Sequence, residues 1–513
     1  MRVKFLISSA IVATVLTGCS DGRNGPDSSA SYEVTADAIG DTLPPDATEK
    51  YKANDISPVR AVAQAPVSTF AVDVDTAAYA NVRRFLTQGD AVPADAVRTE
   101  EMINYFRYDY PRPQDRAAPF SITTDVAQTP WNPQTRLLRI GLRGYDVTGA
   151  ARPAANLVFL VDVSGSMSDT DKLPLVKSAL AGLADQLRPD DRVAIVTYAG
   201  AAGLALAPTA NKTYVREALG CLESGGSTAG AQGIELAYAT ARANFREDGI
   251  NRIILATDGD FNVGISDTRA LEALVRRNRD QGITLTTLGF GQGNYNDAMM
   301  ERIADVGNGN YAYIDSAREA KKVLADELSA TLVTIAKDVK VQVEFNPALV
   351  REYRLIGYEN RALSEEDFTN DAVDAGDMGA GHQVTALYEV VPAGSAGWTP
   401  ARRYPGNRAD AAAPGNIAPD EAAFVKLRYK LPAGGPSREL RRPIAATAFA
   451  SAPRPVGDMA FVTAVAAFGQ KLRGDKYLGS YGWRDIAGLA VATGGDTRAE
   501  FVKLLAMADK DRG

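Results

Sequence analysis

The chain has 513 residues, of which 45% are hydrophobic and 23% are charged. These proportions are typical of soluble globular proteins, and the length predicts two or three domains. The formal net charge is −7, and Lys and Arg form no long cluster, so nucleic acid is not expected as a partner. A single histidine, His382, argues against a zinc hydrolase and against a Ser-His-Asp enzyme.

The N-terminus has the pattern of a secretory signal. Arg2 and Lys4 precede an apolar run from Phe5 to Leu16, and small residues follow. About 12 apolar residues would span roughly 18 Å as a helix, which is too short for an uncleaved membrane anchor. The ending Leu16-Thr17-Gly18-Cys19 resembles the bacterial lipobox. That resemblance implies a signal peptide over residues 1–18 and acyl chains, such as palmitate, on Cys19.

A lipid on Cys19 would tether the protein to a membrane of the bacterial cell envelope. The residue after the cysteine is Ser20 and not Asp, which favours the periplasmic face of the outer membrane. Residues 19–67 are rich in Asp, Ser, Ala, Pro and Thr without a sustained period, which predicts a flexible tether. Cys221 is then the only remaining thiol, so no intrachain disulfide is expected.

The folded part begins, on this interpretation, at Ser68. Residues 68–153 form an N-terminal α/β region with a strand at Phe70–Val74. Two further segments, Phe120–Thr129 and Arg136–Tyr145, alternate apolar and polar residues as half-buried strands do.

The pattern changes over residues 154–335. Nearly continuous apolar runs, such as Leu157–Val161 and Arg252–Ala256, alternate there with amphipathic segments such as Leu173–Leu187. Buried strands that alternate with helices predict a parallel sheet covered on both faces. We therefore expect a doubly wound, mostly parallel, Rossmann-like α/β unit.

Alternating strands return over residues 336–450, and residues 451–513 have the pattern of a small helical region. Strand-rich sequence thus stands on both sides of the α/β unit. The predicted fold class is α/β, with the doubly wound sheet inserted in a β-sandwich built from both flanks and a C-terminal helical region after it.

Oxygen-bearing side chains gather at the predicted strand ends of the α/β unit. Asp162, Ser164 and Ser166 follow its first strand, Thr228 follows a Gly-Gly pair, and Asp258 ends a later strand. Ligands of doubly wound sheets bind at the carboxyl ends of the strands. Carboxylates and hydroxyls are hard donors, so Mg²⁺, Mn²⁺ or Ca²⁺ is expected rather than zinc. Taken alone, Asp-x-Ser-x-Ser is better explained by a turn whose side chains cap backbone groups, and the strand context with the two later loops favours the metal site.

The five positions together resemble the metal-ion-dependent adhesion site of von Willebrand factor A (VWA) domains. Other segments resemble bacterial VWA lipoproteins that have their own N- and C-terminal regions, namely Phe70–Thr76, Glu101–Phe106, Asp258–Gly264 and Tyr353–Asn360. This resemblance implies that Ser164, Ser166 and Thr228 bind the metal directly, and that Asp162 and Asp258 bind it directly or through water. It implies a protein partner whose Asp or Glu carboxylate completes the coordination of the metal, with Mg²⁺ the expected ion.

Two alternatives to a metal-dependent binding module stay open. Asp73-Val74-Asp75-Thr76 resembles the nucleophile motif of haloacid dehalogenase-type phosphatases, but position 77 is Ala where Thr or Val is expected. Capping of the following helix is the favoured interpretation of Asp75 and Thr76, so no catalytic residue is assigned and the protein is not expected to be an enzyme. The second alternative is a structural envelope protein whose metal only stabilises the fold.

Overall fold

The computed structural model describes most of the chain after the expected tether. The described residues are 49–72, 74–114, 118–147, 151–227, 230–259, 268–293, 295–327, 330, 332–400, 420–490 and 495–510. The expected signal peptide, Cys19, Asp73 and Thr228 lie outside these ranges. Among the helices within them, none is both long enough and apolar enough to cross a membrane.

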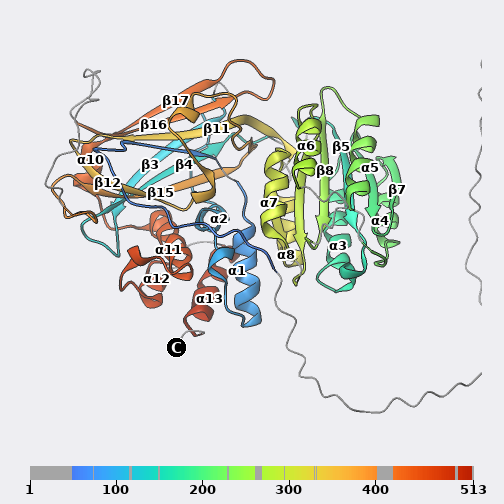
Figure 1. Ribbon diagram of the computed structural model, residues 1–513, viewed down its shortest axis with the longest axis horizontal. Helices are drawn as coiled ribbons and strands as arrows, with labels where there is room; N and C mark the ends of the chain where they lie inside the picture. The colour runs from blue at the N-terminus through green and yellow to red at the C-terminus, as the bar shows by residue number, and fades with distance from the viewer. Residues whose placement is uncertain are drawn as a thin grey trace, which may run out of the picture. The chain divides into compact units, whose positions relative to one another are not determined.

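A six-stranded sheet has the strand order β10-β9-β8-β5-β6-β7 (Figure 1). Neighbouring strands of this sheet are parallel, except for the edge strand β7, which is antiparallel to β6. The strand bounds are β5 Ala155–Asp162, β6 Arg192–Tyr198, β7 Ala202–Thr209, β8 Ile250–Thr257, β9 Thr284–Phe290 and β10 Tyr311–Ile314. The helix bounds are α3 Leu173–Asp185, α4 Lys212–Gly220, α5 Gly230–Ala243, α6 Thr268–Arg279, α7 Asp297–Val306 and α8 Ala317–Lys321, followed by a π-helical turn at Lys322–Asp326.

Both faces of this sheet are buried. Successive residues of β5 point to opposite sides, so Phe159 belongs to one apolar core, with Leu180 of α3, whereas Leu160 belongs to a second, with Ile234 of α5. Every residue of β5 is buried. The predicted doubly wound, mostly parallel sheet is therefore confirmed.

Two antiparallel sheets form a sandwich, with strand orders β1-β12-β15-β4-β3 and β13-β2-β11-β16-β17. Each sheet pairs strands from both flanks: Leu138 of β4 is opposite Tyr388 of β15, and Ser68 of β2 is opposite Val343 of β11. The predicted insertion of the α/β unit into a sandwich of both flanks is confirmed. The strand bounds are β1 Arg60–Ala61, β2 Val67–Ala71, β3 Phe120–Gln128, β4 Arg136–Gly144, β11 Thr334–Phe345, β12 Val350–Ile356, β13 Ala362–Leu363, β14 Met378–Gly379, β15 Gln383–Pro392, β16 Glu421–Lys430 and β17 Arg438–Ala445.

The C-terminal helices share one core with two helices of the N-terminal flank (Figure 1). Phe106, just after α2, meets Phe461 of α11 and Phe501 of α13 edge-on. The predicted helical region is present, and it packs against α1 and α2. The helix bounds are α1 Ala77–Gln88, α2 Thr99–Asn104, α10 Ala446–Ala450, α11 Gly457–Leu472, α12 Trp483–Leu489 and α13 Asp496–Lys510.

The C-terminal part of the expected tether needs correction. Lys50 forms a parallel bridge with Asn296, Arg60 is in β1 opposite Tyr353, and the side chain of Val62 is 1% exposed. Residues 49–67 therefore belong to the folded unit. The apolar residues of this segment follow no sustained period, and β1 is only two residues long, which is why periodicity did not indicate this.

Candidate functional site

The candidate site begins at Asp162, the last residue of β5. The chain places β6 and β7 on one side of β5 and β8, β9 and β10 on the other, so strand order reverses at β5. At such a reversal the loops after neighbouring strands diverge and leave room for a ligand at the carboxyl edge. Asp162 is therefore at the place where this fold binds ligands.

The carboxylate of Asp162 is buried and accepts four hydrogen bonds. Oδ1 accepts from the backbone N–H of Ser164 at 2.9 Å and from its hydroxyl at 2.6 Å. Oδ2 accepts from the hydroxyls of Tyr198 at 3.0 Å and Thr257 at 2.9 Å. Burial raises the pKa of Asp162, and hydrogen bonds from Ser164 and Thr257 oppose that rise. These contacts fix the direction of the carboxylate at the strand end.

Two hydroxyl groups lie next to this carboxylate. The chain turns into a short 3₁₀ helix, Gly165–Ser168, and the Ser164 Oγ is 3.1 Å from the Ser166 Oγ. Ser164 is buried and Ser166 is half-buried, so the pair faces from the interior towards solvent. The predicted trio of Asp162, Ser164 and Ser166 is thus one hydrogen-bonded cluster.

The Gly-Gly loop after α4 closes on this turn. Gly226 accepts a hydrogen bond from the N–H of Gly165 at 3.0 Å, and the N–H of Gly225 donates to Val163 at 2.8 Å. Gly226 has a φ of +82°, which favours glycine. Thr228 lies outside the described residues, two positions after a glycine that contacts the Ser-x-Ser turn.

Asp258 follows β8, the neighbour of β5, and its side chain is buried. Its carboxylate raises the pKa of Asp162, so the two acidic groups interact electrostatically. The ammonium of Lys172 donates to Asp258 Oδ2 at 3.0 Å. Sequence reasoning assigned no role to Lys172, Tyr198 or Thr257, because a lone Lys before a helix and polar residues at strand ends carry no specific signal.

The donor set fits a hard divalent cation. Within the described ranges, no group of three or more His, Cys, Asp or Glu side chains could hold a metal. A metal centre here would depend on hydroxyl and carboxylate oxygens. Mg²⁺, Mn²⁺ and Ca²⁺ are commonly bound by such oxygens, whereas zinc sites are usually built from Cys and His.

Asp75 makes structural contacts with other parts of the chain. Its Oδ1 accepts from the N–H of Tyr311 at 2.8 Å, and Arg361 is paired with Oδ2 at 3.4 Å. Thr76 is the N-cap residue of α1 but makes no side-chain capping bond, so the expected capping by its hydroxyl is wrong, and Glu101 accepts from the N–H of Ala78.

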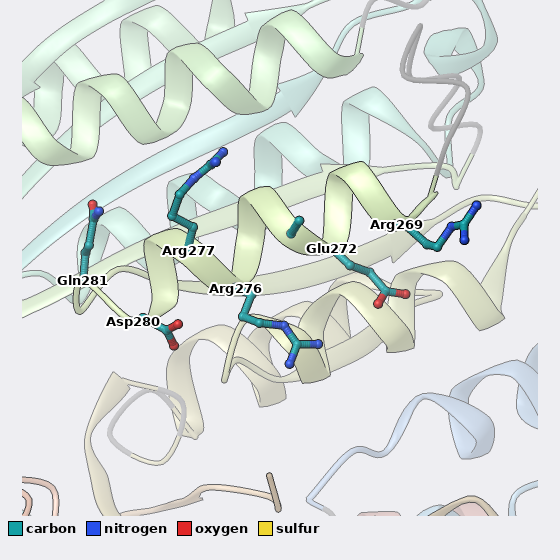
Figure 2. Close-up of a pocket in the computed structure, with 7 residues that line it drawn as sticks. Arg269, Glu272, Arg276, Arg277, Asp280 and Gln281 are labelled. Atoms are coloured by element: carbon teal, nitrogen blue, oxygen red, sulfur yellow. The ribbon is translucent and has the colours of Figure 1, made fainter. Parts of the chain in front are cut away.

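A hollow on the surface of α6 is a second place where polar side chains gather (Figure 2). Arg269, Glu272 and Arg276 extend from successive turns of the helix, and Asp280 and Gln281 follow it. The labelled side chains fan out along the helix and do not converge on one point (Figure 2). The strand ends at Asp162 and Asp258 therefore remain the better candidate.

Family models match three consecutive parts of the chain. The model of the von Willebrand factor type A domain matches residues 156–327, and a von Willebrand factor model matches residues 45–139. The model of the C-terminal region of the uncharacterized protein YfbK matches residues 330–510.

Among curated proteins, the uncharacterized protein YfbK of Escherichia coli strain K12 is 47% identical over 475 residues, which cover 90% of this chain and 81% of that protein. The uncharacterized protein sll0103 of Synechocystis is 34% identical over 187 residues, covering 36% of this chain and 43% of that protein. A solved structure of von Willebrand factor type A from Catenulispora acidiphila has a TM-score of 0.43 at 18% identity, covering 78% of this chain and 91% of that one. The extent of the match to YfbK confirms the predicted family: the chain belongs to the bacterial VWA-domain proteins that include YfbK.

Proposed function

We propose that this protein is a membrane-tethered, metal-dependent protein-binding module of the bacterial envelope. The observation that supports the proposal is the convergence of Asp162, Ser164 and Ser166 beside Asp258, at the carboxyl edge of the sheet. A VWA domain is in general a protein-interaction or adhesion-type module, and these oxygen donors suit a divalent cation.

Ser164, Ser166 and Thr228 would hold the cation directly, and Asp162 and Asp258 would hold it directly or through water. Neutral hydroxyl ligands leave much of the positive charge of the ion uncompensated. The bound ion would therefore supply an electrophilic position for an Asp or Glu carboxylate of a protein partner. The residues of this chain would orient the ion, and the hydrogen bonds on Asp162 would keep its carboxylate in place.

The location of the module is part of the same proposal. Acyl chains on Cys19 would hold the protein on the periplasmic face of the outer membrane, and the segment after Cys19 would give it reach. Mg²⁺ is the ion we expect there.

The metal site can be tested by titration calorimetry on the full, metal-free chain in detergent. Mg²⁺ and Mn²⁺ should each saturate one site in the wild type, and the Ser164→Ala/Ser166→Ala variant should bind neither. Ser168→Ala is a matched control, because Ser168 is exposed at the end of the same 3₁₀ helix and should leave the binding unchanged. A folded wild type that binds neither metal would overturn the proposal.

The partner is tested in a second step. Envelope proteins retained by the wild type in Mg²⁺ and released by EDTA should be lost with Asp162→Ala, while Ser168→Ala retains them.

The alternative function is a structural envelope protein whose metal only stabilises the fold, and the four hydrogen bonds on the buried Asp162 are the observation that supports it. It predicts that EDTA lowers the melting temperature while the site variants still retain the partner. A catalytic role is not proposed, because Asp75 is already bound by Tyr311 and Arg361.

A further inference from the structure

A lysine side chain enters the candidate metal site from the side. Lys172 precedes α3, and only 6% of its surface is exposed. Its ammonium is 3.0 Å from Asp258 Oδ2 and 3.9 Å from Asp169 Oδ2, whose side chain is largely exposed. The ammonium of Lys172 therefore adds a positive charge beside Asp258, the carboxylate that is proposed to bind the divalent cation.

The loop after β9 is shaped around the aliphatic part of this lysine. A Cβ built on Gly291 would overlap the Cγ, Cδ and Cε atoms of Lys172, and Gly291 has a φ of +69°. The carbonyl of Gly291 accepts a hydrogen bond from the hydroxyl of Tyr313 at 2.6 Å, which holds the loop. The side chain of Lys172 thus passes so close to Gly291 that no Cβ fits there, and its buried ammonium is held on Asp258.

The charges of the site make the position of this ammonium consequential. Asp162 and Asp258 are two buried carboxylates that interact, and Lys172 offsets one of their negative charges. A divalent cation near Asp258 would meet the repulsion of the ammonium, and this repulsion is weakly screened because both side chains are buried. A metal ion therefore gains less from Asp258 in the presence of Lys172 than in its absence.

We infer that Lys172 is a built-in counter-cation of the metal site, which neutralises Asp258 and holds the affinity for a free metal ion low. This inference rests on the proposed function. Lys172 offsets the negative charge of Asp258, and a partner carboxylate supplies a further negative charge to the metal ion. Metal and partner therefore bind cooperatively, and each raises the affinity for the other. Lys172 then makes ion capture tighter in the presence of the partner than in its absence.

A purely structural role for the Lys172–Asp258 pair predicts something different. Removing one member of a buried ion pair leaves its partner uncompensated and lowers stability. If that were its only role, replacement of Lys172 would destabilise the protein without tightening metal binding.

The test is calorimetric titration of Mn²⁺, then Mg²⁺, into the full metal-free chain carrying Lys172→Met. The expected result is an affinity about tenfold or more above that of the wild type, because the repulsive charge is gone and Asp258 needs a new counter-charge. Lys177→Met is the matched control: it removes the same charge from α3, where Lys177 donates to the Gly220 carbonyl at 3.1 Å. Lys172→Arg keeps the charge and should stay within about threefold of the wild type.

The outcomes separate this inference from the proposed function. Wild-type binding that Lys172→Met does not tighten, or that Lys177→Met tightens equally, overturns the role of Lys172 and leaves the metal site standing. Absence of metal binding in all folded variants overturns the site and the inference together. Thermal melting with increasing Mn²⁺ provides a second readout if metal-free Lys172→Met is less stable, since its melting temperature should then rise more steeply with metal.

Discussion

Arg98, just before α2, and Asp297, the first residue of α7, form a buried two-point ion pair. The distances are 2.5 Å from Nη1 to Oδ2 and 3.2 Å from Nη2 to Oδ1. The pair joins the N-terminal flank to the inserted VWA unit across 199 positions of sequence. Arg98 also contacts Glu101, and Tyr311 donates to Asp297 at 2.6 Å, so the pair lies in a larger polar network.

Loss of this arginine is expected to weaken the attachment of the VWA unit. Arg98→Met leaves Asp297 and Glu101 buried without their cation, which should cost about 3–5 kcal/mol of unfolding free energy. Arg302→Met is the control, because Arg302 is half-exposed in its pair with Glu272 and should cost less than about 1 kcal/mol. Denaturant unfolding measures both, and equal costs for the two variants would contradict the prediction.

Residues behind Asp162 should tune the proposed metal site without being ligands. Thr257→Val and Tyr198→Phe each remove one hydroxyl that donates to Asp162 Oδ2 and keep most of the side-chain volume. Loss of such supporting contacts typically costs about 10–100-fold in metal affinity, so each variant should bind Mn²⁺ more weakly by an amount of that order. Circular dichroism checks the fold. Wild-type affinity in both variants would show that Asp162 does not depend on these hydroxyls.

Substitution of two glycines in the loop after β9 should show how tightly this loop packs on Lys172. Gly291 and Gly293 both have positive φ, but a Cβ on Gly293 would meet nothing within 4 Å. Gly293→Ala should therefore lower stability by about 1–2 kcal/mol through backbone strain alone. Gly291→Ala adds overlap with the Lys172 side chain and should cost about 1–3 kcal/mol more. Similar unfolding free energies for the two variants would mean that Lys172 moves aside easily.

The part of the candidate site that sequence could predict is the part that directly follows expected strand ends. Asp162, Ser164 and Ser166 are neighbours in the chain, and the rule for doubly wound sheets adds Asp258 from another strand end. Lys172 could not be predicted, because 86 positions separate it from Asp258 and a loop after a third strand leads it there. Thr228 stays a prediction.

The fold shows the same division between local and distant information. Alternation of apolar and polar residues predicts strands in both flanks, and their pairing into one sandwich is confirmed. Periodicity does not say which apolar faces meet, so the shared core of α1, α2 and α11 was not expected. Strands of two residues, such as β1 and β13, have no period to detect.

The single histidine should leave a measurable trace in acid stability. His382 lies in the turn between β14 and β15, and its Nδ1 accepts from the N–H of Gly379 at 3.3 Å. Burial lowers the pKa of His382 from 6.5 to about 4; Arg107, Lys322 and Arg252 lower it further, and Glu327 opposes them. The unfolded chain therefore takes up this proton at a higher pH than the folded chain does.

Because the folded pKa is the lower one, the stabilising contribution of neutral His382 is fully present above about pH 6.5 and is lost as the pH falls towards about 4. His382→Asn keeps an acceptor near the position of Nδ1 but has no proton to gain. Between pH 6.5 and 4, the unfolding free energy of the wild type should fall by about 2 kcal/mol more than that of the variant, somewhat less than the full shift because the imidazole is only half-buried. Denaturant midpoints at half-unit pH steps measure the difference, in which carboxylates distant from His382 cancel. Parallel curves over this range would show that the folded protein accommodates a protonated His382.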